Sequence, residues 1–134
     1  MPRIAHVILE SIAGYGAEVK AGRHRLTTDE STAAGGADAG PAPFQLLLAA
    51  LAACTSATLR MYAERKGWSL GTIHVELEIT KEAEQPPSKI GRIIKVSGPL
   101  DDSQRQRLAE IAEKTPVTRT LKAGVAIETS VEPA

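Results

Sequence analysis

The sequence predicts an α+β fold, in which short strands lie on either side of one long helix. Three patterns lead to this prediction. Glycine-punctuated runs of Ile, Val and Thr open the chain, a long apolar stretch covers residues 43–66, and residues 73–79 alternate strictly between apolar and polar. The predicted order is βββ-α-ββ-α-β. With 134 residues, a single domain over 1–134 is expected.

The first third of the chain predicts two or three strands and a long loop. The strands correspond to "RIAHVILES", "AEVKAG" and "RHRLTTDE", with glycine turns between them. The segment "STAAGGADAGPAP" follows and is rich in small residues, glycine and proline. A loop of that length inside a compact domain is usually functional or mobile.

A long helix is predicted over residues 43–66. Arg65 and Lys66 suit its last turn, and Gly67 suits the position after it. Its first half is apolar on every face, which predicts burial against the sheets. Because one other clear helix and a few strands cannot cover it all round, we expect an intertwined homodimer that packs two such helices together. The uninterrupted apolar run is too short to span a bilayer.

The remaining elements are a pair of strands, a short helix and a last strand. "TIHVELEIT" and "KIGRIIKVSG" predict the pair. Asp101 is the expected N-cap of a surface helix whose apolar stripe comprises Leu108, Ile111 and Ala112. "VAIETSVE" alternates again and predicts a final strand.

Composition excludes several classes of function. The chain holds 16 basic and 16 acidic residues and few aromatic ones, so neither nucleic acid nor an anionic membrane is an expected partner. The three histidines show no Cys/His spacing, so no metal and no cofactor is expected. The N-terminus lacks the pattern of a secretory signal, which favours a cytoplasmic protein.

Cys54, the only cysteine, lies within the apolar helix and allows two interpretations. Free cysteine is often a small core residue. As a nucleophile it would need a cation or a hydrogen-bond donor nearby, because a free thiol is only slightly ionised at pH 7. Arg60 lies on the far face of the same helix from Cys54. Arg119 is either a structural ion-pair partner or a cation of the site.

The stretch "GGADAGPAPFQLLLAALAACTSATLRMYAERKGW", with "GRHRLTTDE" before it and "AEKTPVTRTL" after it, resembles the OsmC/Ohr family of osmotically inducible and organic hydroperoxide resistance proteins. The resemblance extends from about residue 14 to 130. It implies an intertwined α+β homodimer with two long central helices and active sites at the interface. It also implies that Cys54 attacks an organic hydroperoxide and becomes a sulfenic acid. In such proteins a second cysteine, in a "CPV" segment, then forms a disulfide that external dithiols reduce.

Three positions depart from that family pattern. Thr115 stands where the second cysteine is expected, so a two-cysteine cycle is not available. Phe44 and Gln45 occupy the helix start, where the family carries an acidic residue. No arginine matches the catalytic one, and Arg25 is only nearby in sequence.

Two functional hypotheses follow from the resemblance. In the first, Cys54 reduces organic hydroperoxides as a one-cysteine peroxidase, and an external thiol is the reductant. In the second, the protein is non-catalytic and binds a hydrophobic small molecule at the dimer interface. A structural dimer without a ligand is a further possibility. The residues expected to line the site besides Cys54 are Gln45, Phe44, Thr115, Arg119 and Arg25.

Overall fold

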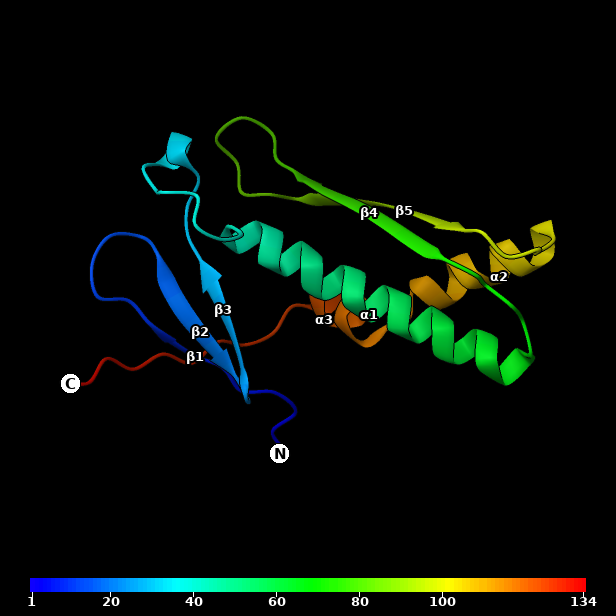
Figure 1. Cartoon of the computed structure of the whole chain (residues 1–134), viewed down its shortest axis with the longest axis horizontal. Coiled ribbons are helices and arrows are strands. Elements are labelled where there is room, and N and C mark those ends of the chain that lie inside the picture. Colours follow the sequence, from blue (N-terminus) through cyan, green and yellow to red (C-terminus); the bar gives the residue numbers. More distant parts are fainter. The chain divides into compact units, whose positions relative to one another are not determined.

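A computed structural model describes all residues of the chain, 1–134 (Figure 1). The chain divides into two compact units, Met1–Ala49 and Ala50–Ala134. The boundary falls inside the long helix α1, Pro43–Lys66. The predicted α+β class is confirmed, and the single domain over 1–134 stays a prediction.

The first unit contains a three-stranded antiparallel sheet. Its strands are β1 (Ile8–Glu10), β2 (Ala17–Ala21) and β3 (His24–Thr28), paired in that order. Leu9 lies opposite Val19, and Val19 lies opposite Leu26. The three runs that the sequence marked as strands are therefore strands, although β1 is shorter than its apolar run.

The loop between β3 and α1 is held by hydrogen bonds from its own backbone. The Asp29 carboxylate accepts from the amides of Glu30 at 2.8 Å and of Ala37 and Ala39 at 3.2 Å each. A Cβ at Gly40 would lie 2.1 Å from the Thr27 carbonyl oxygen, so only glycine fits there. One 3₁₀ turn, η1 (Thr32–Ala34), interrupts this loop. A single buried carboxylate thus organises about a dozen residues.

The second unit begins within α1. The helix has the predicted bounds and ends as expected, with Gly67 at a φ of 71° and the Trp68 amide bonded to the Ala63 carbonyl at 2.9 Å. Strands β4 (Ile73–Thr80) and β5 (Lys89–Val96) form an antiparallel hairpin. Helices α2 (Asp102–Ala112) and α3 (Pro116–Ala123) follow. Asp101 caps α2 as predicted, in a capping box with Gln104.

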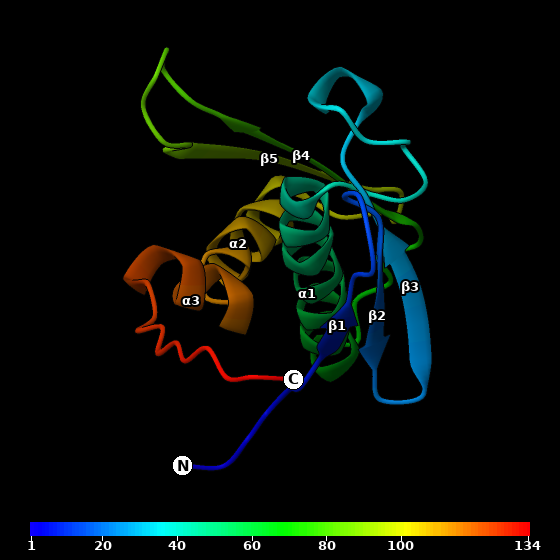
Figure 2. The ribbon, with the colours of Figure 1, turned by 90° about the vertical axis from the view of Figure 1, so that its left-hand side faces the viewer.

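The core of the second unit lies between α1, the hairpin and α2. Figures 1 and 2 show the hairpin along one side of α1 and α2 and α3 along another. Strand residues of the inner face, such as Ile73, Ile94 and Val96, pack against the buried cluster. That cluster consists of Leu59, Ala63, Leu70, Leu100, Leu108 and Ala112.

Helix α1 is buried along one stripe only. Its buried residues are Leu51, Thr55, Leu59 and Ala63, each four positions apart. The prediction that this helix is buried on every side is therefore not met within one chain. By length and composition alone α1 could cross a membrane, contrary to the sequence-based estimate, although core helices of soluble proteins meet the same criterion.

The end of the chain differs from the prediction. The segment "VAIETSVE" forms no strand, and Val125 and Ile127 are 67% and 85% exposed. A strand needs a paired neighbour for its backbone groups, and this segment is paired with no strand. Helix α3 was not predicted. Thr115 caps it and Pro116 begins it, a start signal that the sequence does contain.

Replacing Leu59 by alanine tests the core of the second unit. Leu59 is fully buried, so we expect the Leu59→Ala variant to lose about 2–5 kcal/mol in the free energy of unfolding. The control is Glu64→Ala on the exposed face of the same helix, which should change stability by less than about 0.5 kcal/mol. Urea unfolding at one protein concentration measures both. Equal losses in the two variants would contradict this core.

Acid should loosen the loop that Asp29 holds. The amides of Ala39, then Glu30 and Ala37, lower the pKa of Asp29 below its ordinary value of 3.8, although burial acts in the opposite direction. A carboxyl group with a lowered pKa stabilises the fold above its unfolded pKa, and this stabilisation is lost as the pH falls through the folded value. We therefore expect amide exchange at Ala37 and Ala39 to gain protection from pH 3 to pH 5 beyond the intrinsic pH effect. The Asp29→Asn variant should lack this step.

Candidate functional site

Cys54 lies in the middle of α1, beside the buried stripe. Its side chain is partly buried, and its Sγ lies 4.0 Å from the Thr58 hydroxyl one turn later. The next residue, Thr55, is fully buried and donates its hydroxyl proton to the Leu51 carbonyl at 2.7 Å. Cys54 therefore retains access to solvent, while its neighbour faces the core.

A nearly buried arginine binds Thr55 from the hairpin. Arg92 on β5 donates from Nη1 to the Thr55 hydroxyl at 2.9 Å and to the Thr118 hydroxyl at 3.0 Å. Its Nη2 donates to the Ala112 carbonyl at 3.0 Å. The side chain is only 12% exposed. One guanidinium thus joins β5 to α1, to the end of α2 and to α3.

The hydroxyl groups around Arg92 form one connected network. Thr118 Oγ1 lies 3.2 Å from the Ala112 carbonyl and 2.6 Å from the hydroxyl of Thr115. Since the carbonyl can only accept, Thr118 donates to it and receives from Arg92 and Thr115. Thr55, Thr115 and Thr118 are all buried, and no buried side-chain nitrogen or oxygen in the chain lacks a partner.

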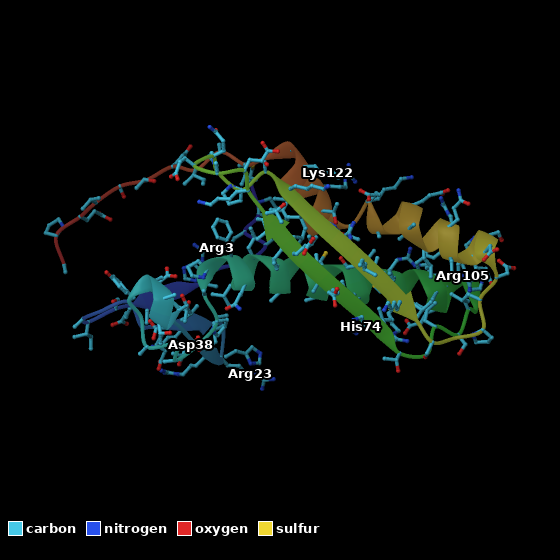
Figure 3. The ribbon with its side chains drawn as sticks, turned by 90° about the horizontal axis from the view of Figure 1, so that it is seen from above. Arg3, Arg23, Asp38, His74, Arg105 and Lys122 are labelled. Atoms are coloured by element: carbon cyan, nitrogen blue, oxygen red, sulfur yellow. The ribbon has the colours of Figure 1, made fainter.

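The charge of Arg92 has no close carboxylate partner in this network. Glu113 Oε1 is 3.9 Å from Nη2, and its side chain is 57% exposed. That carboxylate bonds Lys122, which Figure 3 labels on α3, and this bond is the main cause of the lowered pKa of Glu113. Arg92 contributes less to that shift. The cation is therefore held chiefly by neutral oxygens.

Thr115 and Arg119 lie at the start of α3 with different surroundings. Thr115, at the position of the expected second cysteine, is fully buried and accepts the Thr118 amide as the helix N-cap. It connects to Thr55 through Thr118 and Arg92. Arg119 is exposed. Arg60, which was considered as a cation beside Cys54, donates to the Gly71 carbonyl at 3.0 Å.

The other predicted site residues belong to the first unit. Gln45 accepts the Ala42 amide at 2.8 Å, which caps the start of α1. Phe44 is 51% exposed. Arg25 pairs with Glu18 across the sheet at 2.5 Å. Their role beside Cys54 stays a prediction.

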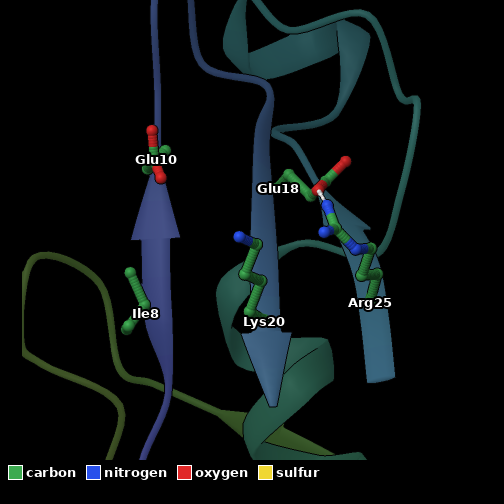
Figure 4. A pocket seen from close by; sticks show the side chains of 5 residues that line it. All are labelled: Ile8, Glu10, Glu18, Lys20 and Arg25. Carbon is green, nitrogen blue, oxygen red and sulfur yellow. Dashed lines mark hydrogen bonds and ion pairs between the residues drawn. The ribbon is translucent and has the colours of Figure 1, made fainter. Parts of the chain in front are cut away.

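A shallow cavity lies on the three-stranded sheet (Figure 4). Its volume is about 240 Å³, and charged side chains dominate its lining. The Glu18–Arg25 ion pair occupies one side of it. The lining residues are Ile8, Glu10, Glu18, Lys20 and Arg25. An apolar ligand would find few contacts there.

Sequence reasoning missed Arg92, although a signal for it exists. In β5 the residues Ile90, Arg92, Ile94 and Val96 share one face, and Arg92 lies opposite Leu77 of β4. An arginine in an apolar row of a half-buried strand must find buried acceptors. Those acceptors come from three helices that are distant in the sequence, so only the fold identifies them.

Comparisons with known proteins agree on the fold. The family model described as OsmC-like protein matches residues 35–130. No match was found among curated proteins. The solved structures named below are under 25% identical to this chain, so they support its fold alone.

Three of these structures cover about nine-tenths of both chains. An OsmC-like protein from Mycoplasma pneumoniae has a TM-score of 0.80 at 16% identity and covers 91% of this chain and 89% of its own. An organic hydroperoxide resistance protein OsmC from Legionella pneumophila, also described as a predicted redox protein, has a TM-score of 0.69 at 20% identity. This match covers 90% of this chain and 92% of the Legionella chain. The organic hydroperoxide resistance protein OhrB of Bacillus subtilis has a TM-score of 0.64 at 23% identity. This match covers 90% of this chain and 91% of the Bacillus chain. Because the family model covers most of the chain and these folds agree with it, the chain belongs to the family of OsmC-like proteins.

Proposed function

We propose that the protein reduces organic hydroperoxides through Cys54, with an external thiol as reductant. The observation that carries this proposal is the position of Cys54, a partly exposed thiol in the middle of the central helix of an OsmC-like fold. Two structures with this fold bear the name of organic hydroperoxide resistance proteins.

The chemistry needs one thiolate and two reducing equivalents. The Cys54 thiolate attacks the terminal oxygen of R–O–O–H, the O–O bond breaks, and the alkoxide leaves and takes up a proton as the alcohol. Cys54 is then a sulfenic acid. An external thiol R′SH attacks its sulfur, releases water and forms a mixed disulfide. A second R′SH frees the Cys54 thiol and leaves as R′S–SR′.

An external reductant follows from the content of the chain. Cys54 is the only cysteine, and a hydroxyl occupies position 115 in a buried cap. A disulfide within one chain is therefore impossible. Because Cys54 is partly exposed, a small thiol or a protein thiol can reach it.

A homodimer is part of this proposal. The exposed face of α1 carries Ala53, Ala57 and Met61, and Met61 is 52% exposed. Val125, Ile127 and Val131 of the C-terminal segment are exposed as well. A second copy would cover these apolar groups. A cytoplasmic location is part of the same proposal, since OsmC-like proteins are generally soluble.

Peroxide should oxidise Cys54 selectively. With stoichiometric cumene hydroperoxide and a sulfenic-acid trap, we expect one trap per chain, at a peroxide level that leaves free cysteine unmodified. Intact-mass spectrometry measures the adduct. The Cys54→Ser variant should show no adduct, because no other thiol exists.

The opposite outcome would remove the enzymatic proposal. If Cys54 reacts no faster than free cysteine, the protein is not a peroxidase. The non-catalytic hypothesis, a hydrophobic ligand at the dimer interface, then takes its place.

A cysteine at position 115 should restore the two-cysteine cycle. In the Thr115→Cys variant we expect peroxide to produce an intramolecular Cys54–position-115 disulfide in place of the trapped sulfenic acid, with the mass lowered by two hydrogens. Thr115→Ser is the matched control, since it keeps the hydroxyl cap of α3 and adds no thiol. A persistent sulfenic acid in the cysteine variant would show that position 115 does not reach Cys54.

A further inference from the structure

We propose that Arg92 is a positioning residue for the reaction at Cys54, an inference that rests on the proposed function. Its guanidinium fixes the α1 turn that carries Cys54 relative to α3 and the end of α2. None of the site residues predicted from the sequence joins these three helices in this way.

The bonding pattern requires a planar fork at this point. Nη1 serves the Thr55 and Thr118 hydroxyls at 2.9 and 3.0 Å, and Nη2 serves the Ala112 carbonyl at 3.0 Å. These acceptors belong to three different helices. A lysine carries all its donors on one nitrogen, so it cannot bind both threonine hydroxyls and the Ala112 carbonyl at once. The charge alone therefore does not replace the side chain.

The network fixes Thr55 in direction as well as in position. Its hydroxyl donates to the Leu51 carbonyl and accepts from Arg92. Because the carbonyl can only accept and Arg92 can only donate, turning the hydroxyl away would leave a buried group without a partner. Cys54 is the preceding residue of the same rigid helix. A rotation or shift of this turn therefore moves the thiol with it.

The energetic situation favours a functional role over a stabilising one. Burying a cation costs desolvation energy, which offsets much of what its hydrogen bonds contribute to stability. Glu113 is 3.9 Å away, half-exposed and bonded to Lys122. Misplacing a reacting group by about 1 Å can cost about 100-fold in rate. Positioning the nucleophile therefore explains the presence of a buried Arg92 better than its contribution to the stability of the fold.

The test compares single-turnover oxidation of Cys54 in full-length variants over a range of cumene hydroperoxide concentrations. Arg92→Lys keeps the charge, Thr55→Val removes the acceptor, and Thr55→Ser keeps it. Arg105→Lys is the control, since Arg105 also donates to a backbone carbonyl, that of Leu100, and pairs with Asp102 on α2. Urea unfolding confirms that each variant is folded.

We expect Arg92→Lys and Thr55→Val to lower the maximal rate about 10- to 100-fold with an unchanged half-saturating peroxide concentration. Thr55→Ser and Arg105→Lys should keep the rate of the natural protein. A merely structural role of Arg92 would lower stability without this pattern. Unchanged rates in folded Arg92→Lys would overturn the proposal.

Alkylation of Cys54 by iodoacetamide separates this inference from the proposed function. If the natural protein does not react with peroxide, the peroxidase proposal fails, and alkylation rates then decide the role of Arg92. A several-fold change in Arg92→Lys and Thr55→Val, absent from Thr55→Ser and Arg105→Lys, supports positioning of the thiol. Equal alkylation rates in all variants overturn it.

Discussion

The arrangement of the second unit depends on how one buried cation is satisfied. Arg92 extends from an apolar strand face into the space between three helices, and its fork meets two threonine hydroxyls and a helix-terminal carbonyl. Each acceptor is held by a further bond: Thr55 donates to the Leu51 carbonyl, and Thr118 donates to the Ala112 carbonyl and bonds Thr115. The mutual placement of α1, α2, α3 and β5 is therefore set by directional bonds in addition to apolar packing.

This constraint gives the position of Thr115 a chemical meaning. A buried hydroxyl at the start of α3 caps the helix and completes the network around Arg92. A thiol there would be a weak hydrogen-bonding group and would cap the helix poorly. The absence of a second cysteine thus coincides with a stabilising polar contact. In the proposed cycle, the step that a second thiol would perform passes to a molecule from outside.

The sequence predicted the elements whose signals are local, and it failed where the signal depends on distant partners. The bounds of α1 follow from its apolar run and Gly67, and Asp101 is a typical N-cap residue just before the stripe of α2. The C-terminal alternation met no neighbouring strand, so its pattern formed no strand in a single chain. Cys54 was recognisable from its motif. Arg92 was not, because its acceptors come together only in the fold.

In the loop before α1, one side chain holds the backbone in a way that does not depend on the side chains of its neighbours. Asp29 binds backbone amides, which every residue except proline possesses, and the side chains of Ala33, Ala37 and Ala39 are exposed. Sequence drift at these alanines should therefore be tolerated in any large library of variants. Asp29 and Gly40 should instead stay nearly invariant in such a library, since one supplies the acceptor and the other leaves room for the Thr27 carbonyl.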